Sequence, residues 1–291
     1  MDDILKDVLC SIKMEAKNFD TLVLSGGSTK GLIILGAVQC AEDKGLLNNV
    51  TNYYGTSAGS IICYLLAIGY SPIEIMVYIC THRLLERLQS FNLISMLNGS
   101  GAISFIHIQD CLEKMTLDKI NRFVTLKELR DLYGKRLVCS TYNNTKQKME
   151  YISPETHPDF PCLIALRLSS NVPLLFDRFS YMENEYVDGG ISDNFPILEA
   201  EKIGKRVLGI TLLTDVATKL DSGPLKFILA LLYVPINQST LHKISMTDPD
   251  KTKVIILDSG TLNNTFTDFN LTSKQKLDMF ASGYQSFKDL Y

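Results

Sequence analysis

A serine between two glycines is the strongest candidate nucleophile in the chain, in the run Gly55-Thr56-Ser57-Ala58-Gly59. A short run rich in β-formers, Asn49 to Tyr54, precedes it, and an apolar run with the character of a buried helix, Ser60 to Gly69, follows it. A strand, a sharp turn with serine at its apex and a helix together make a nucleophile elbow. Both glycines are expected because a Cβ at either position would collide with the neighbouring backbone. An ordinary serine at a strand–helix junction is the alternative.

A glycine-rich loop, Ser25-Gly26-Gly27-Ser28-Thr29-Lys30-Gly31, joins a strand expected over Phe19 to Leu24 to an apolar helix expected over Gly31 to Lys44. Such a loop presents backbone N–H groups that suit a phosphate or a developing oxyanion. Dinucleotide binding is disfavoured, because Ser28 replaces the middle glycine of that motif and the next strand does not end in a carboxylate. An oxyanion hole fits better, since the first two strands can lie side by side and bring this loop beside Ser57.

Asp188, in the run Tyr186-Val187-Asp188-Gly189-Gly190, is the candidate base that a hydroxyl nucleophile needs. It stands at an expected strand end, and the two glycines let its carboxylate turn toward a neighbouring strand end. An aspartate in a plain turn is the alternative. With a reference pKa of ~3.9, aspartate becomes a useful base only where burial or exclusion of water raises that pKa.

The composition indicates a globular α/β protein and excludes several classes. The 291 residues are 46% hydrophobic and 21% charged, which is ordinary for a soluble domain. A net charge of −3 without a basic block argues against a nucleic-acid partner. Seven cysteines without a C-x-x-C pair favour reduced thiols inside a cell, and four dispersed histidines give no metal site. The N-terminus does not have the pattern of a signal peptide, and the longest apolar run, Leu225 to Ile236, is shorter than the ~20 residues of a membrane span.

The first 70 residues are expected to form a lead-in helix over 3–17 and then strand, helix, strand and helix, the order of a parallel sheet covered by helices. No repeat or linker interrupts the chain, so we expect one domain over 1–291, with the motifs in 19–205 and with 206–291 completing the sheet and its helices. Further helices are expected over Ser71–Ser90, Ile108–Ile120, Thr125–Leu132, Pro161–Ser170, Pro196–Lys202, Leu225–Val234 and Thr272–Leu290. Further strands are expected over Arg136–Tyr142, Lys148–Ile152, Phe179–Val187, Arg206–Leu212 and Lys253–Leu257.

In order and spacing, these motifs resemble those of the patatin-like phospholipase family: a glycine-rich loop, G-x-S-x-G, and Asp-Gly-Gly or Asp-Gly-Ala. The continuation Ile191-Ser192-Asp193-Asn194-Phe195-Pro196 and the stretch from Ala165 to Pro173 also look like the family. The resemblance covers residues 21–196. It implies a three-layer α/β fold with a mostly parallel central sheet flanked by helices.

The resemblance also implies a lipid acyl hydrolase of the phospholipase A type, which works by a Ser–Asp dyad without a cofactor or a metal. Ser57 would attack the ester carbonyl, and Asp188 would accept its proton and later activate water. The N–H groups of Gly26, Gly27 and Ser28 would hold the oxyanion. The positions that would support these motifs are Lys30, Gly31, Gly55, Gly59, Gly189 and Gly190.

Two positions of the glycine-rich loop need comment. Ser28 stands where the family usually has a third glycine, and a serine is strained there if the position needs positive φ. Lys30 stands where the family has Arg or Lys, so it either orients the loop or meets a phosphate head group. The implied substrate is a phospholipid acyl ester, reached at a membrane surface by a cytoplasmic protein that does not insert. The sequence leaves the head group and the oligomeric state open.

Two other functions stay open. One is an α/β-hydrolase that uses Ser57, Asp188 and His242 in that order; the early elbow and the lack of a glycine or strand end around His242 argue against it. The other is a lipid-binding or regulatory module of the same fold, in which Ser28 has disabled the loop. Two segments could act as a lid, the loop Asn92 to Phe105 and the apolar helix Leu225–Val234.

Overall fold

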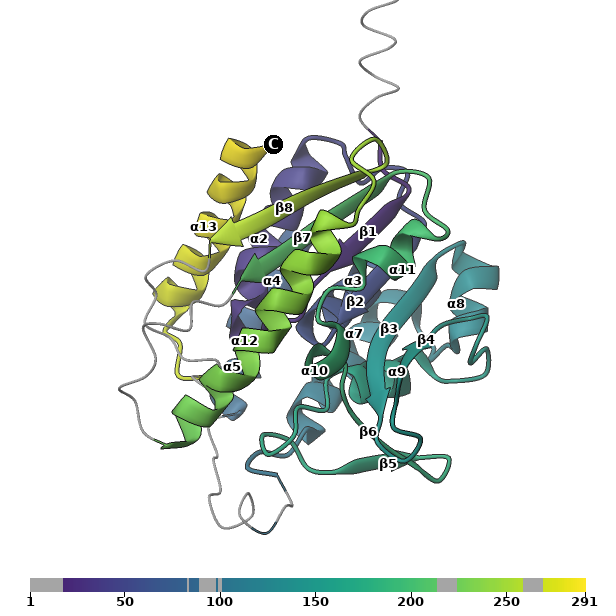
Figure 1. The fold of residues 1–291 in the computed structure, drawn as a ribbon, viewed down its shortest axis with the longest axis vertical. Coiled ribbons are helices and arrows are strands. Elements are labelled where there is room, and N and C mark those ends of the chain that lie inside the picture. The colour runs from purple at the N-terminus through teal and green to yellow at the C-terminus, as the bar shows by residue number, and fades with distance from the viewer. Residues whose placement is uncertain (1–17, 83, 89–97, 99–100, 214–223, 259–268) are drawn as a thin grey trace, which may run out of the picture.

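An eight-stranded sheet runs through the molecule in the computed structural model, which describes residues 18–82, 84–88, 98, 101–213, 224–258 and 269–291 (Figure 1). The strand order is β5-β6-β3-β2-β1-β7-β8, and β4 also pairs with β3. The five neighbours from β3 to β8 are parallel, whereas β4, β5 and β6 pair antiparallel at one side. The strands are β1 (Thr21–Leu24), β2 (Asn52–Thr56), β3 (Arg136–Asn143), β4 (Lys148–Ile152), β5 (Phe179–Tyr181), β6 (Asn184–Asp188), β7 (Val207–Leu213) and β8 (Thr252–Asp258).

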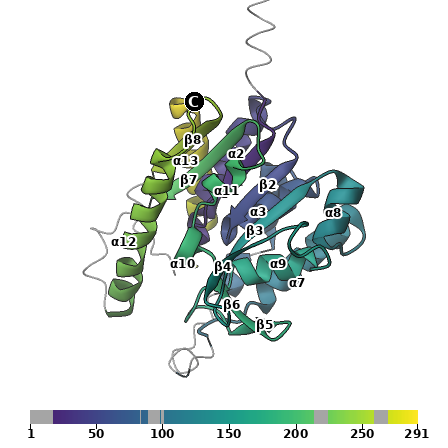
Figure 2. The ribbon, with the colours of Figure 1, turned by 45° about the vertical axis from the view of Figure 1, so that its right-hand side comes forward.

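Helices cover both faces of the sheet, as Figures 1 and 2 show, with α10, α11 and α12 on the face toward the viewer of Figure 1. This arrangement confirms the expected α/β fold with a mostly parallel central sheet flanked by helices. The helical segments are η1 (Ser28–Lys30), α2 (Gly31–Asp43), α3 (Ala58–Ala67), α4 (Pro72–Thr81), α5 (Leu84–Arg87), α7 (Ile106–Ile120), α8 (Leu126–Tyr133), α9 (Cys162–Ser169), α10 (Gly190–Asp193), α11 (Ile197–Glu201), α12 (Pro224–Ser245) and α13 (Ser273–Leu290).

Alternation along the central strands builds a separate core on each face. In β1, Leu22 and Leu24 belong to the larger core with α2, α3 and α13, whereas Val23 belongs to a smaller core with Phe195 and Ile197. Successive side chains of a strand point to opposite faces, so a fully buried strand contributes to both cores. The near-continuous apolar runs of β1 and β7 follow from this double burial.

Three predicted elements differ from the structure. The helix expected over Ser71–Ser90 ends as α4 at Thr81, and α5 is a separate turn. The cause lies in the last turn of α4, where the His82 ring stacks on Tyr78 at 3.9 Å and its Nδ1 lies 3.2 Å from the Tyr78 carbonyl oxygen. Side chains that engage these carbonyls compete with continuation of the helix.

The strand expected over Phe179–Val187 is a hairpin of β5 and β6. Its turn residues Met182 and Glu183 have φ of 45° and 61°. Two successive positive φ values suit the twist of a two-residue hairpin. The sequence lacks the Asn-Gly signal of such a turn, so the break could not be seen there.

The helix expected over Leu225–Val234 continues as α12 to Ser245, through Pro235. α10 was not expected at all. The lead-in helix over 3–17 and residues 92–97, 99 and 100 of the expected loop lie outside the described residues. No single helix in the described ranges is long and apolar enough to cross a membrane; only α3 and α4 taken together, bent by 117°, match a span in length and composition.

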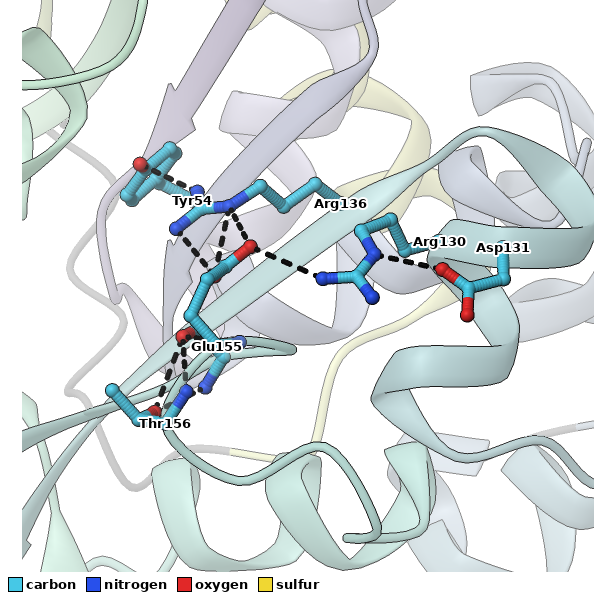
Figure 3. A network of polar contacts seen from close by, with 7 residues as sticks. Tyr54, Arg130, Asp131, Arg136, Glu155 and Thr156 are labelled. Atoms are coloured by element: carbon cyan, nitrogen blue, oxygen red, sulfur yellow. Dashed lines mark hydrogen bonds and ion pairs between the residues drawn. The ribbon is translucent and has the colours of Figure 1, made fainter.

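A polar network ties the strands together at the amino end of the parallel sheet (Figure 3). Arg136, the first residue of β3, donates from Nη1 to the hydroxyl of Tyr54 at 2.6 Å and from Nε to both carboxylate oxygens of Glu155 at 3.1 Å. Arg130 approaches the same carboxylate at 3.6 Å. The network lies at the opposite end of β2 and β3 from Ser57, so it supports the sheet rather than the candidate site.

Candidate active site

Ser57 occupies a strained turn between β2 and α3. Its φ of 52° and ψ of −124° lie in a region that residues other than glycine rarely adopt. The flanking glycines are required as expected: a Cβ on Gly55 would lie 2.5 Å from Ser60 Cα, and one on Gly59 would lie 2.5 Å from the carbonyl oxygen of Leu24. The strand-turn-helix context of the elbow is therefore confirmed.

The glycine-rich loop lies beside this turn, because β1 and β2 are adjacent and parallel. A Cβ on Gly26 would be 3.3 Å from Ser57 Cβ. The Gly26 N–H, however, donates to the carbonyl oxygen of Asn194 at 3.2 Å. The structure therefore argues against Gly26 as an oxyanion donor, since its N–H already holds the loop to the segment after Asp188.

Gly27 and Ser28, the other two predicted oxyanion donors, lie next to Ser57. Gly27 lines the same cleft as Ser57, and its N–H makes no hydrogen bond within the described ranges. Ser28 has a φ of 48°, so this position does need the left-handed conformation that a glycine would adopt without strain. The oxyanion assignment stays a prediction for Gly27 and Ser28.

Asp188 meets Ser57 along one edge of β3. β4 pairs with the other edge, from Cys139 to Asn143, so β2 and β6 share this edge and lie end to end. β2 ends where Thr56 pairs with Ser140, and β6 ends where Asp188 pairs with Thr141, so the two candidates sit at nearly the same level of the sheet. The chain after Asp188 passes so close to β3 that a Cβ on Gly189 would lie 2.3 Å from the Ser140 carbonyl oxygen. The Asp-Gly-Gly run is thus needed for this close approach.

Burial makes Asp188 an unusual carboxylate. Its side chain is 5% exposed, and this burial raises its pKa to about 6, although hydrogen bonding to Ser57 and to the Gly190 N–H lowers it. Oδ1 accepts the Gly190 N–H at 2.7 Å, whereas Oδ2 has no well-aligned partner in the described residues. The Ser57 hydroxyl is therefore close but imperfectly aligned, as is common before substrate binds.

The end of α9 and the loop after it fix both candidates, a role that sequence reasoning did not assign to them. The Ser57 N–H donates to Ser169 Oγ at 3.0 Å, and the Gly189 N–H points to the Ser169 carbonyl oxygen at 3.4 Å. The Asp188 N–H donates to the Asn171 carbonyl oxygen at 2.9 Å. Both residues lie in the stretch from Ala165 to Pro173 that resembles the family, which was the available signal.

An ion pair between Asp193 and Lys243 joins the candidate site to α12. Asp193, 4% exposed, binds Lys243 Nζ of α12 at 2.7 Å and the Tyr151 hydroxyl at 2.6 Å, and its carbonyl oxygen accepts the Thr56 hydroxyl at 2.9 Å. This anchor places Tyr233 of α12 close to Asp188. Burial and that carboxylate raise the pKa of the Tyr233 phenol.

Two cavities meet at Ser57, which alone among the described residues lines both of them. The first, about 660 Å³ including space open to solvent, is the cleft that contains Asp188; its walls include Pro173, Leu174, Tyr233 and Ile236. The second, about 920 Å³ on the same measure, runs between α2, α3, α4, α5 and α7 and is almost wholly apolar. The geometry thus brings a candidate nucleophile and a candidate base to a point where two cavities meet.

The remaining predicted residues lie outside this centre. Lys30 is 5% exposed and lines neither cavity, which favours the loop-orienting role over contact with a head group. His242 is on an exposed part of α12 and lines neither cavity. Within the described ranges, no cluster of His, Cys, Asp and Glu could hold a metal ion.

One viral protein and two solved structures are similar to this chain in sequence or in fold. A probable lipid hydrolase, 463L, of Invertebrate iridescent virus 6 is 38% identical over 193 residues, which cover 64% of this chain and 65% of that protein. VipD from Legionella pneumophila has a TM-score of 0.55 at 19% identity, covering 94% of this chain and 66% of VipD. Human GIVD cytosolic phospholipase A2 has a TM-score of 0.52 at 11% identity, covering 92% and 57% of the two chains. At these identities the two structures show a shared fold.

The chain thus spans 57% to 66% of the length of these proteins, less than two thirds of each. The model of one family, the patatin-like phospholipases, matches residues 22–201, more than half of the sequence. That match contains the elbow, the glycine-rich loop and the Asp188-Gly189-Gly190 run, and the expectation drawn from those motifs is confirmed: the chain belongs to the patatin-like phospholipase family.

Proposed function

We propose that this protein hydrolyses acyl esters of phospholipids with Ser57 and Asp188 as a catalytic dyad. The observation that carries the proposal is the pairing of a strained, cleft-facing serine with a buried aspartate whose pKa is raised to about 6. A base with a pKa near the working pH is the most effective, and an ordinary aspartate would be far too weak. Here burial supplies the shift, with no cation beside the carboxylate.

In the proposed reaction, Ser57 Oγ attacks the ester carbonyl carbon while its proton moves to Asp188. The N–H groups of Gly27 and Ser28 stabilise the oxyanion that forms. As the C–O bond breaks, Asp188 returns the proton to the departing alcohol and leaves an acyl-Ser57 ester. Asp188 then takes a proton from water, whose oxygen attacks the acyl carbon, and release of the fatty acid restores both groups.

The test is hydrolysis of dioleoylphosphatidylcholine vesicles by the protein and by two variants, Ser57→Ala and Asp188→Asn. We expect a loss of at least ~10³-fold in each variant with the fold intact by circular dichroism. His242→Ala serves as the matched control and should retain activity. Its collapse would instead favour the Ser–His–Asp alternative.

A fluorophosphonate distinguishes the enzyme from a binding module of the same fold. Such a probe reacts with an activated serine, and human GIVD cytosolic phospholipase A2, which shares the fold, was crystallised with a linolenyl fluorophosphonate. We expect labelling of the protein but not of Ser57→Ala. An intact protein that resists labelling would favour the binding module, with Ser28 as the disabling position.

We also propose that the mouth of the cleft meets the membrane surface directly. Exposed apolar side chains surround it: Leu174 is 45% exposed and Ile191 is 49% exposed, and both line the cleft. Leu231 and Val234, 48% and 44% exposed, lie on α12 next to the cleft residue Tyr233. Binding of Ser57→Ala protein to anionic vesicles should weaken when Leu174 and Ile191 become serine. The same change at Leu132 and Ile203, equally exposed elsewhere, should have no effect.

An intracellular location is part of the same proposal. Its support is that the six cysteines in the described ranges are free thiols, and five of them are buried. Reduced, scattered thiols are typical of reducing compartments. Mass spectrometry of thiols alkylated in intact cells tests this, because oxidised cysteines would contradict it.

A further inference from the structure

We infer that the second cavity is the binding site for the fatty-acyl chain, and that the alcohol part of the substrate lies in the Asp188 cleft. The inference rests on the proposed function and goes beyond it, because it assigns each half of the substrate to a cavity. Among the residues that the structure describes, Ser57 alone lines both cavities, so an ester bound at Ser57 has one place for each of its halves.

The direction of the ester follows from the path of the proton. Asp188 lines only the first cavity, and in the proposed reaction it must return a proton to the departing alcohol oxygen. The alcohol must therefore leave on the Asp188 side. The acyl chain, attached to the other side of the carbonyl carbon, then points into the second cavity.

The chemistry of the second cavity fits a hydrocarbon chain. None of its described lining residues is Asp, Glu, Lys or Arg, and its walls are side chains such as Leu35, Ile62, Leu65 and Met115. α3 begins next to Ser57, and both Ala58 and Leu65 line the cavity, so the lining extends ~10 Å along that helix. A long flexible apolar ligand with its reactive end at Ser57 matches this shape.

The wall of the cavity is held by an ion pair that the chemistry does not use. Leu84, Leu85 and Phe269 line the cavity, and Glu86 of α5 binds Lys276 Nζ of α13 at 2.8 Å. Lys276 is completely buried. Because breaking the pair would leave the buried Lys276 charge uncompensated, the pair holds α5, which lines the cavity, against α13.

The first test is the dependence of kcat/KM on chain length for p-nitrophenyl butyrate, octanoate, dodecanoate and palmitate. Burial of each added methylene should raise kcat/KM about fourfold until the cavity is filled. A profile that is flat from butyrate onward overturns the inference. If butyrate is still hydrolysed and the activity needs Ser57, the proposed function survives that result.

The second test narrows the cavity from α4. Ile79 lines it and is half-buried, whereas Val77, two residues away, is 54% exposed on the outer side of the same helix. Ile79→Phe should lower the ratio of kcat/KM for dodecanoate over butyrate by about tenfold. Val77→Phe adds similar bulk outside the cavity and should leave the ratio unchanged. Equal ratios in the two variants would overturn the inference.

A binding measurement makes the test independent of catalysis. Cis-parinaric acid, a fluorescent fatty acid, should bind the Ser57→Ala protein, and Ile79→Phe in that background should weaken binding by about tenfold. Thermal melts check that both proteins are folded. No binding by folded Ser57→Ala protein, or equal binding by the double variant, contradicts the acyl site whatever the esterase assay shows.

Discussion

Glu155 and Asp188 are carboxylates at opposite ends of the same sheet, and the structure treats them differently. At the amino end, Glu155 accepts two hydrogen bonds from Arg136; burial raises its pKa, but the guanidinium outweighs that effect and holds the pKa below its usual range. At the carboxyl end, Asp188 is buried, none of the described Lys and Arg residues contributes to its pKa shift, and its pKa rises to about 6. The first arrangement favours the charged form, and the second keeps a carboxylate ready to take up a proton.

The comparison separates stability from function. A carboxylate held in its charged form stabilises the fold but is a poor base, whereas a desolvated one is a better base at a cost in stability. The same end of the sheet also holds Ser57 and Ser28, two residues with strained positive φ. Strain and desolvation therefore gather at the carboxyl end of the sheet, as is typical of active sites.

Replacing Asp188 should give the largest effect and should move activity and stability in opposite directions. Asp188→Asn keeps an oxygen for the Gly190 N–H but removes the base, so kcat/KM should fall by ~10³–10⁴-fold. At pH 8 the charged, buried carboxylate is also gone, which should raise the free energy of unfolding by about 2 kcal/mol. Urea titration beside the ester assay measures both quantities. A variant that loses stability at pH 8 would show that the Asp188 charge is compensated.

Replacing Arg136 should lower the stability of the fold and leave the activity unchanged. Arg136→Met leaves the buried Tyr54 hydroxyl and the Glu155 carboxylate without their donor, which should cost about 2 kcal/mol of stability. Arg130→Met is the matched control, because that side chain is more exposed and lies 3.6 Å from Glu155; its cost should stay below about 0.5 kcal/mol. Activity of the folded protein should be unchanged in both. A tenfold fall in kcat would show that the two ends of the sheet are coupled.

The pH dependence should distinguish the two ends in a single protein. Asp188 acts as a base only when ionised, so kcat/KM should rise with pH through an inflection near pH 6. Its raised pKa adds stability below its unfolded value, and that stability is lost as pH rises through about 6. Glu155 has a lowered pKa, so its contribution is present above its unfolded value of 4.5 and is lost as pH falls through the folded value.

Glu155→Gln provides the check on this assignment. The variant should keep the inflection of kcat/KM near pH 6 and lose part of the acid sensitivity of its thermal melt. An inflection that moves in Glu155→Gln, or one that stays below pH 5 in the unmodified protein, would contradict the assignment to Asp188.

The features that the sequence predicted well are local ones. The elbow depends on two glycines around Ser57, and the β1 loop and elbow come together because consecutive strands of a parallel sheet are often neighbours. The structure also confirms the N-terminal cap predicted at Ser71, although the helix that begins there ends at Thr81 instead of Ser90. Spacing within a dozen residues was enough for each of these features.

What the sequence could not show depends on contacts between distant segments. The raised pKa of Asp188 requires the pairing of β6 with β3 beyond the end of β2 and the cover from α12, and neither leaves a local pattern. Tyr233 and Ser169 reach the site from helices whose sequences read as ordinary apolar segments. The hydrogen bond that occupies the Gly26 N–H likewise depends on Asn194, which is 168 residues away.

The smallest expected effect comes from comparing Ser28, in the glycine-rich loop, with a second residue of similar positive φ that lies far from the candidate site. Ser28 and Gln147, an exposed residue in the turn between β3 and β4, have φ of 48° and 52°. Glycine relieves the strain at either position but also loosens the unfolded chain, so each variant should gain only about 0.5 kcal/mol of stability. If Ser28 N–H already holds the oxyanion, Ser28→Gly should keep kcat/KM within about threefold, as Gln147→Gly should. A gain of more than tenfold confined to Ser28→Gly would instead mean that the serine impairs the loop, and a comparable loss would mean that its hydroxyl contributes to the reaction.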